Sequence, residues 1–256
     1  MKKTALVTGA SSGLGAEFIR HLNNKDFDEI WAVARRRERL EALQDITEIP
    51  VRPISMDLTK EESIQELERM LEDEKPDIRL LINAAGFGKI GRYDEISRTE
   101  IDRMIDLNCR AAVDVTQICL PYIKKGGRIM EICSTAGFQP FPYLSVYAAS
   151  KSFLYRYSRA LRQELFGRGI KVTAVCPYWI KDTEFIPTAK KSSGSGHIKG
   201  FPLASHKRSV AVMALNDSRL GLPVSTPGPV CFIHRIAAKF IPSEAMMGIW
   251  QLIRFL

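Results

Sequence analysis

Short apolar segments alternate along the chain with longer segments whose apolar positions follow helical spacing. The short segments predict buried strands, at residues 3–8, 28–35, 51–56, 78–83, 127–133 and 170–176, with a weaker one at 223–226. The longer segments predict helices, at residues 13–25, 37–46, 61–74, 147–167, 207–220 and 101–124, the last with a bend at Pro121. This alternation predicts an α/β fold, a doubly wound Rossmann-type parallel sheet with helices on both faces.

The alternation ends after Pro177. A basic run rich in glycine and serine follows, and a linker there would divide off only about 60 residues, which is small for an independent domain. We therefore expect a single domain over residues 1–256, in which residues 183–206 form a mobile substrate loop over the carboxyl ends of the strands. Residues 230–256 are expected to form an atypical helical tail of two short helices, split near Pro242.

Charge and composition limit the classes of function. The 256 residues carry a formal net charge of +8, but the basic residues are dispersed and form no nucleic-acid motif, so no nucleic-acid partner is expected. No apolar stretch approaches the roughly 20 residues of a membrane-spanning helix. The four histidines lack metal-ligand spacing and the five cysteines form no C-x-x-C pair, so we expect no metal site and a reduced, cytoplasmic protein.

A glycine-rich turn joins the first predicted strand to the first predicted helix. It contains Gly9, Gly13 and Gly15, and glycine lets a backbone turn tightly and come close to a pyrophosphate, while the helix that follows offers free amides. In this position the pattern favours a dinucleotide site, and a purely structural turn is the alternative.

The end of the second predicted strand bears on which dinucleotide is bound. Many dinucleotide sites have a carboxylate here for the ribose hydroxyls, but this strand ends in Arg35 and Arg36. A guanidinium can bind a 2′-phosphate, which a carboxylate would repel. We therefore expect NADP(H) rather than NAD(H), with Arg35 as the principal contact and Arg36 as a helper. The alternative is a solvated, basic start of a helix.

Tyr147 and Lys151 are four residues apart in a predicted helix, so their side chains lie on one face, one turn from each other. A nearby cation favours the phenolate form of a tyrosine, which makes Tyr147 a candidate acid/base group. A tyrosine at the start of a helix is more often a packing residue. The presence of Ser134, Asn108 and the glycine turn favours the functional interpretation.

Together these motifs resemble those of the short-chain dehydrogenase/reductase family. The resemblance runs from Thr4 to about Pro177, and its motifs agree in order and spacing: Thr8-Gly9-(three residues)-Gly13-Leu14-Gly15, Asn83-Ala84-Ala85-Gly86, Leu107-Asn108, Ser134, Tyr147 and Lys151. It implies that Tyr147 gives its proton to a substrate carbonyl as nicotinamide delivers hydride, and that Ser134 holds the carbonyl oxygen. Lys151 would bind the nicotinamide ribose and lower the tyrosine pKa, and Asn108 would support a water-linked proton path to Lys151.

The resemblance also implies the cofactor contacts. Besides Tyr147 and Lys151, they are Gly9, Ser11, Ser12, Gly13, Leu14, Gly15, Arg35, Arg36, Asp57, Leu58, Asn83, Ala84, Gly86, Pro177 and Ile180, with Asp57 matching the family's adenine contact. The chain departs from the family at Tyr178, where relatives commonly have glycine, and this adds bulk beside the expected nicotinamide pocket. It also lacks the glycine pair that ends the last strand in many relatives. We therefore expect a homo-oligomer that is a dimer rather than a tetramer.

Apolar residues lie along the expected loop and around the site: Phe138, Phe141, Tyr143, Tyr178, Phe185, Ile186, Phe201, Pro202 and Leu203. They suggest a roomy pocket for a lipophilic substrate, such as a steroid or a fatty-acyl chain, or else they belong to the core. The strongly apolar end of the chain, residues 245–256, is expected to dock on the loop or to join a dimer rather than to lie on a membrane surface.

These features favour an NADPH-dependent oxidoreductase that interconverts a carbonyl and an alcohol, with Tyr147 as the acid/base group. The alternative is a non-catalytic NADP-binding sensor or regulatory protein on the same fold. Loss of Tyr147 or Lys151 would have favoured that alternative, and both residues are present.

Overall fold

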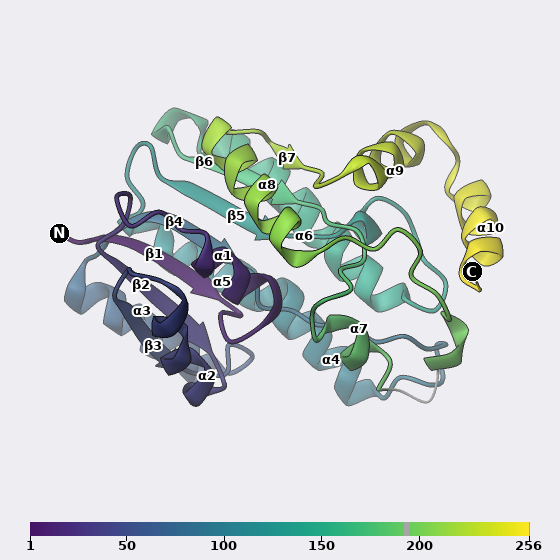
Figure 1. The fold of residues 1–256 in the computed structure, drawn as a ribbon, viewed down its shortest axis with the longest axis horizontal. Helices are drawn as coiled ribbons and strands as arrows, with labels where there is room; N and C mark the ends of the chain where they lie inside the picture. Colours follow the sequence, from purple (N-terminus) through teal and green to yellow (C-terminus); the bar gives the residue numbers. More distant parts are fainter. Residues whose placement is uncertain (192–194, 256) are drawn as a thin grey trace.

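The computed structural model describes residues 1–191 and 195–255. Within these residues the centre of the fold is a parallel sheet of seven strands in the order β3-β2-β1-β4-β5-β6-β7. The strands are β1 (Lys3–Thr8), β2 (Glu29–Ala34), β3 (Val51–Ser55), β4 (Asp77–Asn83), β5 (Arg128–Ile132), β6 (Lys171–Val175) and β7 (Val224–Ser225). The strand order reverses between β1 and β4, which is the point at which open parallel sheets bind ligands (Figure 1).

Helices cover both faces of the sheet (Figure 1). One face packs against α1 (Gly13–Arg20), α2 (Arg37–Glu41) and α8 (Lys207–Leu220), and the other packs against α3 (Glu61–Glu74), α5 (Ala111–Cys119) and α6 (Ser145–Glu164). Beyond the carboxyl ends of the strands lie α4 (Arg98–Ile105), α7 (Phe185–Ala189), α9 (Pro229–Phe240) and α10 (Ser243–Ile253). The predicted fold class is confirmed.

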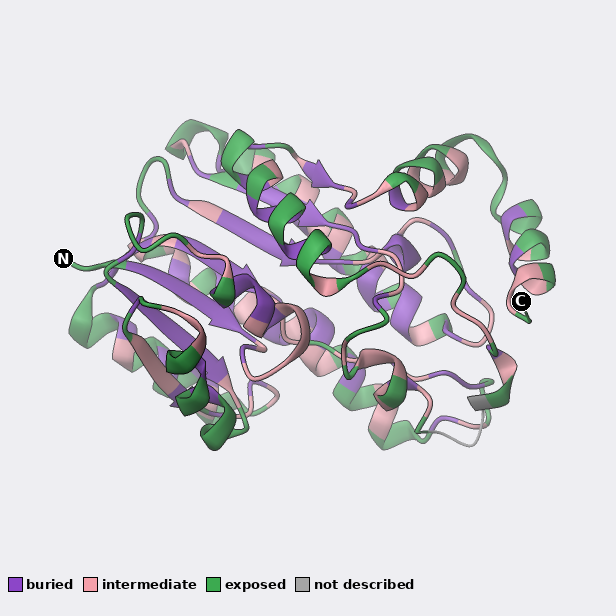
Figure 2. Ribbon diagram, viewed as in Figure 1, coloured by how far each residue is buried: buried purple, intermediate pink, exposed green. Residues whose placement is uncertain are grey.

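The strands are apolar on both faces because both faces are covered. In β1, Leu6 belongs to the cluster that includes α3 and α5, whereas Ala5 and Val7 belong to the cluster that includes α1 and α8. Successive side chains of a strand point to opposite faces, so this alternation supplies two cores from one strand. Figure 2 shows the result: the inner strands are almost entirely buried, the edge strand β3 is only partly buried, and the outer faces of the helices are exposed.

The helix bounds of the structure differ from the predicted ones mainly where turns are not α-helical. The predicted bounds of α3 and α8 are confirmed, but the helix predicted at 101–124 is interrupted by a π-helical turn, η2 (Asp106–Arg110). Short 3₁₀ turns are η1 (Ala42–Ile46), η3 (Leu120–Tyr122), η4 (Thr135–Gly137), η5 (Phe166–Arg168) and η6 (Ser195–His197). Pro121 lies in η3, so the α-helical part ends before it rather than bending there.

Backbone hydrogen bonds join the two ends of the segment predicted as a substrate loop. Ser205 N donates to Trp179 O at 2.8 Å, and Lys181 N donates to Ser205 O at 3.1 Å. Between these points the segment includes α7 and η6, so part of it is helical rather than irregular. Residues 192–194 of the predicted glycine/serine-rich run lie outside the described residues, and the mobility of the segment stays a prediction.

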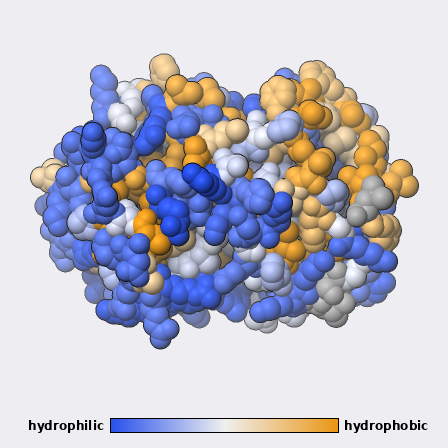
Figure 3. Space-filling model, viewed as in Figure 1, coloured by the Kyte–Doolittle hydropathy of each residue, from blue (hydrophilic) through white to orange (hydrophobic). Residues whose placement is uncertain are grey.

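The tail forms two helices, as predicted, with Pro242 between α9 and α10. The last helix contacts the loop segment, since Arg254 Nη1 donates to His197 O at 2.7 Å and Lys199 N donates to Arg254 O at 3.1 Å. Of the two arrangements expected for the tail, docking on the loop agrees with these contacts, and joining a dimer stays a prediction. Figure 3 shows that apolar side chains nevertheless gather on the outside of the molecule over α9 and α10.

Candidate active site

The glycine turn between β1 and α1 lies directly against the segment that follows β4. Gly9 has a φ of +65°, and a Cβ built on it would lie 2.7 Å from the backbone of Ala84 and Ala85. Thr8 Oγ1 accepts hydrogen bonds from these two backbone amides, at 3.1 and 3.2 Å. The turn therefore requires glycine for both its conformation and its closeness to the neighbouring backbone.

A cavity of about 340 Å³ runs from this turn to α6. Of the predicted site residues it is lined by Gly9, Ser11, Ser12, Gly13, Leu14, Gly15, Arg35, Arg36, Asp57, Leu58, Ala84, Gly86, Ser134, Tyr147, Lys151, Pro177 and Ile180. The fold thus brings together residues from seven separate segments at the carboxyl edge of the sheet. Asn83 and Asn108 do not line it.

The prediction that Asn83 lines the cofactor is wrong for its side chain. Asn83 is buried, and its amide Nδ2 donates to Thr116 Oγ1 at 2.8 Å, to Glu131 Oε1 at 2.9 Å and to Ala112 O at 3.3 Å. As the last residue of β4 it points into the core, where these partners accept from its Nδ2, while its Oδ1 is buried without a hydrogen-bond partner among the described residues. Asn83 therefore fixes the end of β4 against α5 and β5 from behind the cavity wall.

The two predicted arginines occupy different positions. Arg36 lies over the glycine turn, with Nη2 donating to Ser12 Oγ at 2.7 Å and to Ser11 Oγ at 3.2 Å. Arg35 is exposed, and its charge acts on Asp57. Partial burial raises the pKa of Asp57, but hydrogen bonds from Thr59 and the Arg35 charge outweigh burial, so the pKa is lowered overall.

The side chains of Tyr147 and Lys151 are both buried at the inner end of the cavity. Lys151 Nζ donates to Ile132 O at 2.7 Å and lies 5.9 Å from the centre of the Tyr147 ring. A Cβ on Gly86 would lie 3.4 Å from this ammonium and 2.9 Å from Asn108 Oδ1. The absence of a side chain at Gly86 thus keeps the ammonium accessible from the cavity.

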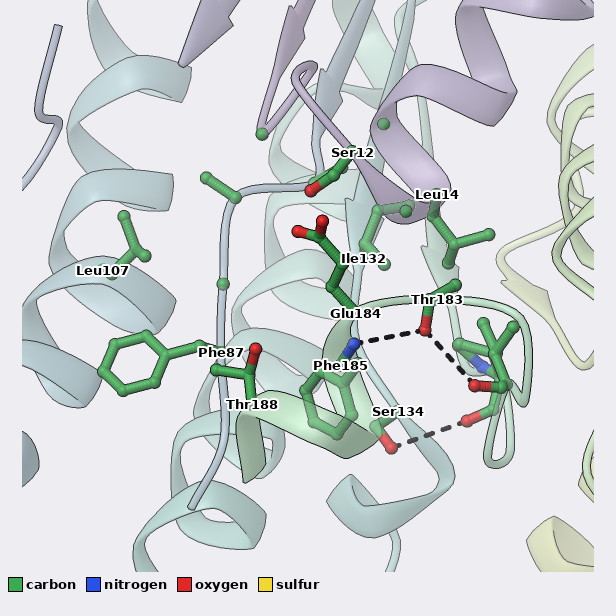
Figure 4. A pocket seen from close by; sticks show the side chains of 18 of the residues that line it. Ser12, Leu14, Phe87, Leu107, Ile132, Ser134, Thr183, Glu184, Phe185 and Thr188 are labelled. Carbon is green, nitrogen blue, oxygen red and sulfur yellow. Dashed lines mark hydrogen bonds between the residues drawn. The ribbon is translucent and has the colours of Figure 1, made fainter. Parts of the chain in front are cut away.

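Ser134 follows β5 and begins the turn η4. Its Oγ accepts a hydrogen bond from Ala136 N at 3.1 Å and donates to Pro177 O at 3.5 Å, and the second of these bonds is drawn in Figure 4. The Ser134 side chain also interacts with the Tyr147 phenol. Its hydroxyl is therefore held between the ends of β5 and β6, next to the phenol.

Asn108 lies in the π-helical turn and is fully buried. Its Nδ2 donates to Phe87 O at 2.9 Å and to Ser150 Oγ at 3.0 Å, and its Oδ1 accepts from Phe87 N at 3.0 Å. Ser150 Oγ in turn donates to Tyr147 O at 2.7 Å. Asn108 therefore ties the segment after β4 to the first turn of α6, and its part in a water-linked proton path stays a prediction.

Burial dominates the acid/base properties of the pair. It raises the pKa of Tyr147, an effect that the Ser134 side chain opposes, and it lowers the pKa of Lys151. That Lys151 lowers the tyrosine pKa in the working site stays a prediction, and in this structure Lys151 does not offset the effect of burial. The physical reason is that the ammonium is turned to Ile132 O rather than to the phenol oxygen.

The outer wall of the cavity comes from α7 and the segment after β6, and it combines aromatic rings with the polar side chains of Thr183, Glu184 and Thr188. The ring of Phe185 lies 5.3 Å from that of Tyr147, and Thr183 Oγ1 donates to Ile180 O at 3.2 Å. Figure 4 shows Thr183 beside Phe185. Of the residues predicted for an apolar pocket, Phe141, Tyr178 and Phe185 line the cavity. Those that do not line it are Phe138, Tyr143, Ile186, Phe201, Pro202 and Leu203.

The cavity fits a dinucleotide in its donors and shape. The glycine turn and the start of α1 at Gly13 present backbone amides, and Arg36 adds a guanidinium above them. Comparison with known proteins agrees with this fit: the sequence profile described as short chain dehydrogenase matches residues 3–193. The chain belongs to the short-chain dehydrogenase/reductase family.

Relatives within this family of oxidoreductases can be compared over most of the chain. A short-chain dehydrogenase from Sphingobium yanoikuyae in complex with NADPH is similar with a TM-score of 0.79 and 28% identity, over 96% of this chain and 94% of that one. A bulky-bulky ketone specific alcohol dehydrogenase from Comamonas testosteroni is similar with a TM-score of 0.76 and 27% identity, over 98% of this chain and 94% of that one. An NADP-dependent 3-hydroxy acid dehydrogenase of Salmonella typhi is 33% identical over 183 residues, 70% of this chain and 73% of its own.

Two charged residues of this family member that sequence reasoning missed lie beside Arg36. Glu184 accepts from Arg36 Nη1 at 3.0 Å and from Arg39 Nη1 at 2.6 Å, so it bridges the two guanidinium groups. The spacing of Arg36 and Arg39, one helical turn, is a signal that could have pointed to Arg39. Glu184 gave no such signal, because its partners are 148 and 145 positions away.

Other possible kinds of site have no support in the part of the chain that the structure describes. Within residues 1–191 and 195–255, no three His, Cys, Asp or Glu side chains lie together as a metal site would require. The five cysteines are buried and free. Among the same residues, no helix has both the length and the apolar character needed to cross a membrane.

Proposed function

We propose that the protein is an NADPH-dependent oxidoreductase that interconverts a carbonyl and an alcohol, with Tyr147 as the acid/base group. The observation that carries this proposal is that Tyr147, Ser134 and Lys151 converge at one end of a cavity whose other end is bounded by Arg36. One end supplies proton transfer and the other supplies a cation at the expected position of a 2′-phosphate.

Each residue has a distinct part in the proposed reaction. The bound dinucleotide supplies hydride to the carbonyl carbon or accepts it from the alcohol. In the reductive direction, the Tyr147 hydroxyl gives its proton to the substrate oxygen, and Ser134 Oγ–H donates a hydrogen bond to that same oxygen. Burial keeps Tyr147 protonated until then, because it raises the pKa of the phenol. The Lys151 ammonium holds the nicotinamide ribose and favours the phenolate that is left.

The preference for NADP(H) rests on the two arginines after β2. No carboxylate ends this strand, and Arg36 is already held over the glycine turn by Ser11 and Ser12. A fixed guanidinium suits a phosphate, because less side-chain freedom is lost when the phosphate binds. The Sphingobium protein is in complex with NADPH and the Salmonella protein is NADP-dependent, and both similarities support the same choice.

A lipophilic carbonyl compound is the substrate class that the cavity wall favours. Phe141, Tyr178, Trp179 and Phe185 line the cavity on the side of Tyr147, and such rings favour apolar groups over charged ones. The similarity to an alcohol dehydrogenase described as specific for bulky-bulky ketones supports a large substrate.

The test is NADPH oxidation, followed by absorbance, across a panel of ketones, aldehydes, steroids and acyl substrates. We expect turnover with at least one apolar carbonyl compound, and a kcat that falls by about 100-fold or more in Tyr147→Phe while NADPH binding is retained. Tyr93→Phe, at an exposed tyrosine, is the matched control and should change neither. Near-normal turnover by Tyr147→Phe would refute the role of Tyr147. Binding of NADPH without any turnover would favour a sensor instead.

A further inference from the structure

The outward face of α9 is apolar. Phe232 and Ile233 are adjacent, Ile236 and Phe240 follow at three- and four-residue spacing, and the exposed fractions of the four are 57%, 64%, 44% and 74%. Cys231, on the opposite side of the helix, is fully buried. The helix is thus packed on the body through one side and presents large apolar side chains to the outside on the other.

The last helix, α10, repeats this arrangement. Met246 and Trp250 are buried, and Trp250 Nε1 donates to Pro142 O at 3.2 Å, which fixes the inner face. Ile249, Leu252 and Phe255 point outward, with exposed fractions of 48%, 76% and 50%. With the four residues of α9 they form what we call the terminal patch: Phe232, Ile233, Ile236, Phe240, Ile249, Leu252 and Phe255.

The charges on and beside the two helices of the terminal patch are mainly positive, the exception being Glu244 in the first turn of α10. The helix α9 carries Arg235 and Lys239 and no acidic residue. At the other end, Lys199 Nζ lies 5.7 Å and the Arg254 guanidinium 3.9 Å from the centre of the Phe255 ring. A second copy of the chain seated face to face would bring the two α9 cations of each copy close to one another. An anionic surface complements both the apolar and the basic residues.

We propose that the terminal patch binds the surface of a lipid bilayer that contains anionic phospholipids. Its apolar side chains would enter the boundary between headgroups and acyl chains, while Arg235, Lys239, Lys199 and Arg254 contact the phosphates. Because no described helix is long and apolar enough to span a membrane, the contact is peripheral. This reverses the order in which the sequence alone ranked a dimer above a membrane, and the reason is the charge on α9.

The helix α10, which carries part of the terminal patch on its outer face, packs against the candidate active site through its inner face. The ring of Trp250 lies 5.0 Å from that of Phe141, which lines the cavity, and both belong to one apolar cluster with Tyr147. The cavity of a molecule bound through the terminal patch would therefore lie near the bilayer in which a lipophilic carbonyl compound dissolves. This consequence rests on the proposed function, whereas membrane binding itself does not.

The experiment is sedimentation of the full chain with vesicles of phosphatidylcholine, with and without phosphatidylglycerol. We expect binding to the anionic vesicles that weakens as salt rises, and little binding to the neutral ones. Arg235→Gln/Lys239→Gln should weaken binding to anionic vesicles by about tenfold or more. Phe232→Ser/Phe240→Ser should weaken it to a similar extent, because two outward rings no longer enter the bilayer.

Matched controls are Phe166→Ser, at an aromatic residue that is 80% exposed in η5, and Lys25→Gln/Lys60→Gln, at exposed lysines elsewhere. The variants change exposed side chains, except that Arg235 is partly buried, and thermal unfolding checks that each is folded. No binding of the wild type to anionic vesicles would overturn the proposal, as would equal losses in the control variants. A dimer that Phe232→Ser/Phe240→Ser dissociates, without vesicle binding, would identify the terminal patch as a contact between copies and overturn it as well.

Discussion

Glu184 Oε2 lies 3.0 Å from Arg36 Nη1, so a carboxylate from the segment after β6 pairs with the guanidinium proposed to bind a 2′-phosphate. The pair joins the outer wall of the cavity to the start of α2. The Glu184 carboxylate accepts a hydrogen bond from Arg36 that a bound phosphate would otherwise accept. Cofactor binding and the position of the segment that carries α7 are therefore linked through one side chain.

Replacing Glu184 by glutamine should tighten the binding of a 2′-phosphate. Both side chains are partly exposed, with 43% and 52% of their surface accessible, so the competition is weak and we expect an improvement of about two- to fivefold. Calorimetric titration with 2′,5′-ADP measures the effect, and 5′-AMP should bind unchanged. Glu41→Gln, which breaks the neighbouring pair with Arg37, is the matched control. An equal gain for both nucleotides would contradict the competition.

Arg36→Ala should selectively weaken NADPH. Loss of a charge-assisted contact to the 2′-phosphate predicts an increase in Kd of about 10- to 100-fold, with NADH unaffected. Fluorescence titration with both cofactors measures this selectivity. Arg37→Ala, at an arginine that pairs only with its helical neighbour Glu41 among the described residues, should leave both affinities unchanged. The same experiment with Arg35→Ala decides which arginine is the principal contact.

Gly9→Ala should destabilise the fold. The new Cβ would lie 2.7 Å from the backbone of Ala84 and would require a φ of +65°, which alanine avoids. We expect the free energy of unfolding in urea to fall by about 2 kcal/mol or more. Gly167→Ala is the control, because no heavy atom lies within 4 Å of its Cβ position. Equal stability of the two variants would mean that the turn tolerates a side chain.

Glu131 predicts a pH dependence of stability. Burial raises the pKa of this carboxyl to about 7 from an ordinary 4.5, although hydrogen bonds from Asn83 and Thr116 oppose the rise. The pKa of Glu131 is higher in the folded state than in the unfolded state. Its contribution to the free energy of unfolding is therefore fully present below about pH 4.5 and is lost as the pH rises through about 7. Glu131→Gln should therefore be more stable than the wild type by about 2 kcal/mol at about pH 8, and close to it at about pH 4.5.

Urea unfolding at the two pH values measures the difference for Glu131→Gln. The glutamine keeps an oxygen that can accept from Asn83 and Thr116, so the core contacts remain. Glu66→Gln, at an exposed position of α3, is expected to change little. A constant gap between Glu131→Gln and the wild type at both pH values would contradict a buried, titrating Glu131.

Local patterns in the sequence were enough for much of the fold. The bounds of α3 and α8 follow from their amphipathic spacing, and the glycine turn marks the junction of β1 and α1. The convergence of Tyr147, Lys151 and Ser134 on one cavity also follows, because the carboxyl ends of parallel strands meet at one edge.

Features that depend on contacts between distant residues could not be predicted. The side chain of Asn83 turns to Glu131, 48 positions away, and a polar residue at the end of a strand gives no sign of which way it points. The bridge from Glu184 to Arg36 spans 148 positions. The net pKa shift of Tyr147 depends on burial by residues that only the folded chain brings to it.

The π-helical turn at Asp106–Arg110 lets two consecutive helices, α4 and α5, pack against different parts of the molecule. Met104 of α4 packs in the cluster around Tyr147, whereas Val115 and Cys119 of α5 pack under the sheet. A wider turn rotates the side chains that follow it about the helix axis. The side chains of α4 and of α5 can therefore face different partners although the helical segments are continuous. Asn108 lies at the joint between them. In an uninterrupted α-helix, Asn108 could not keep its hydrogen bonds to the Phe87 backbone while α5 kept its present face against the sheet.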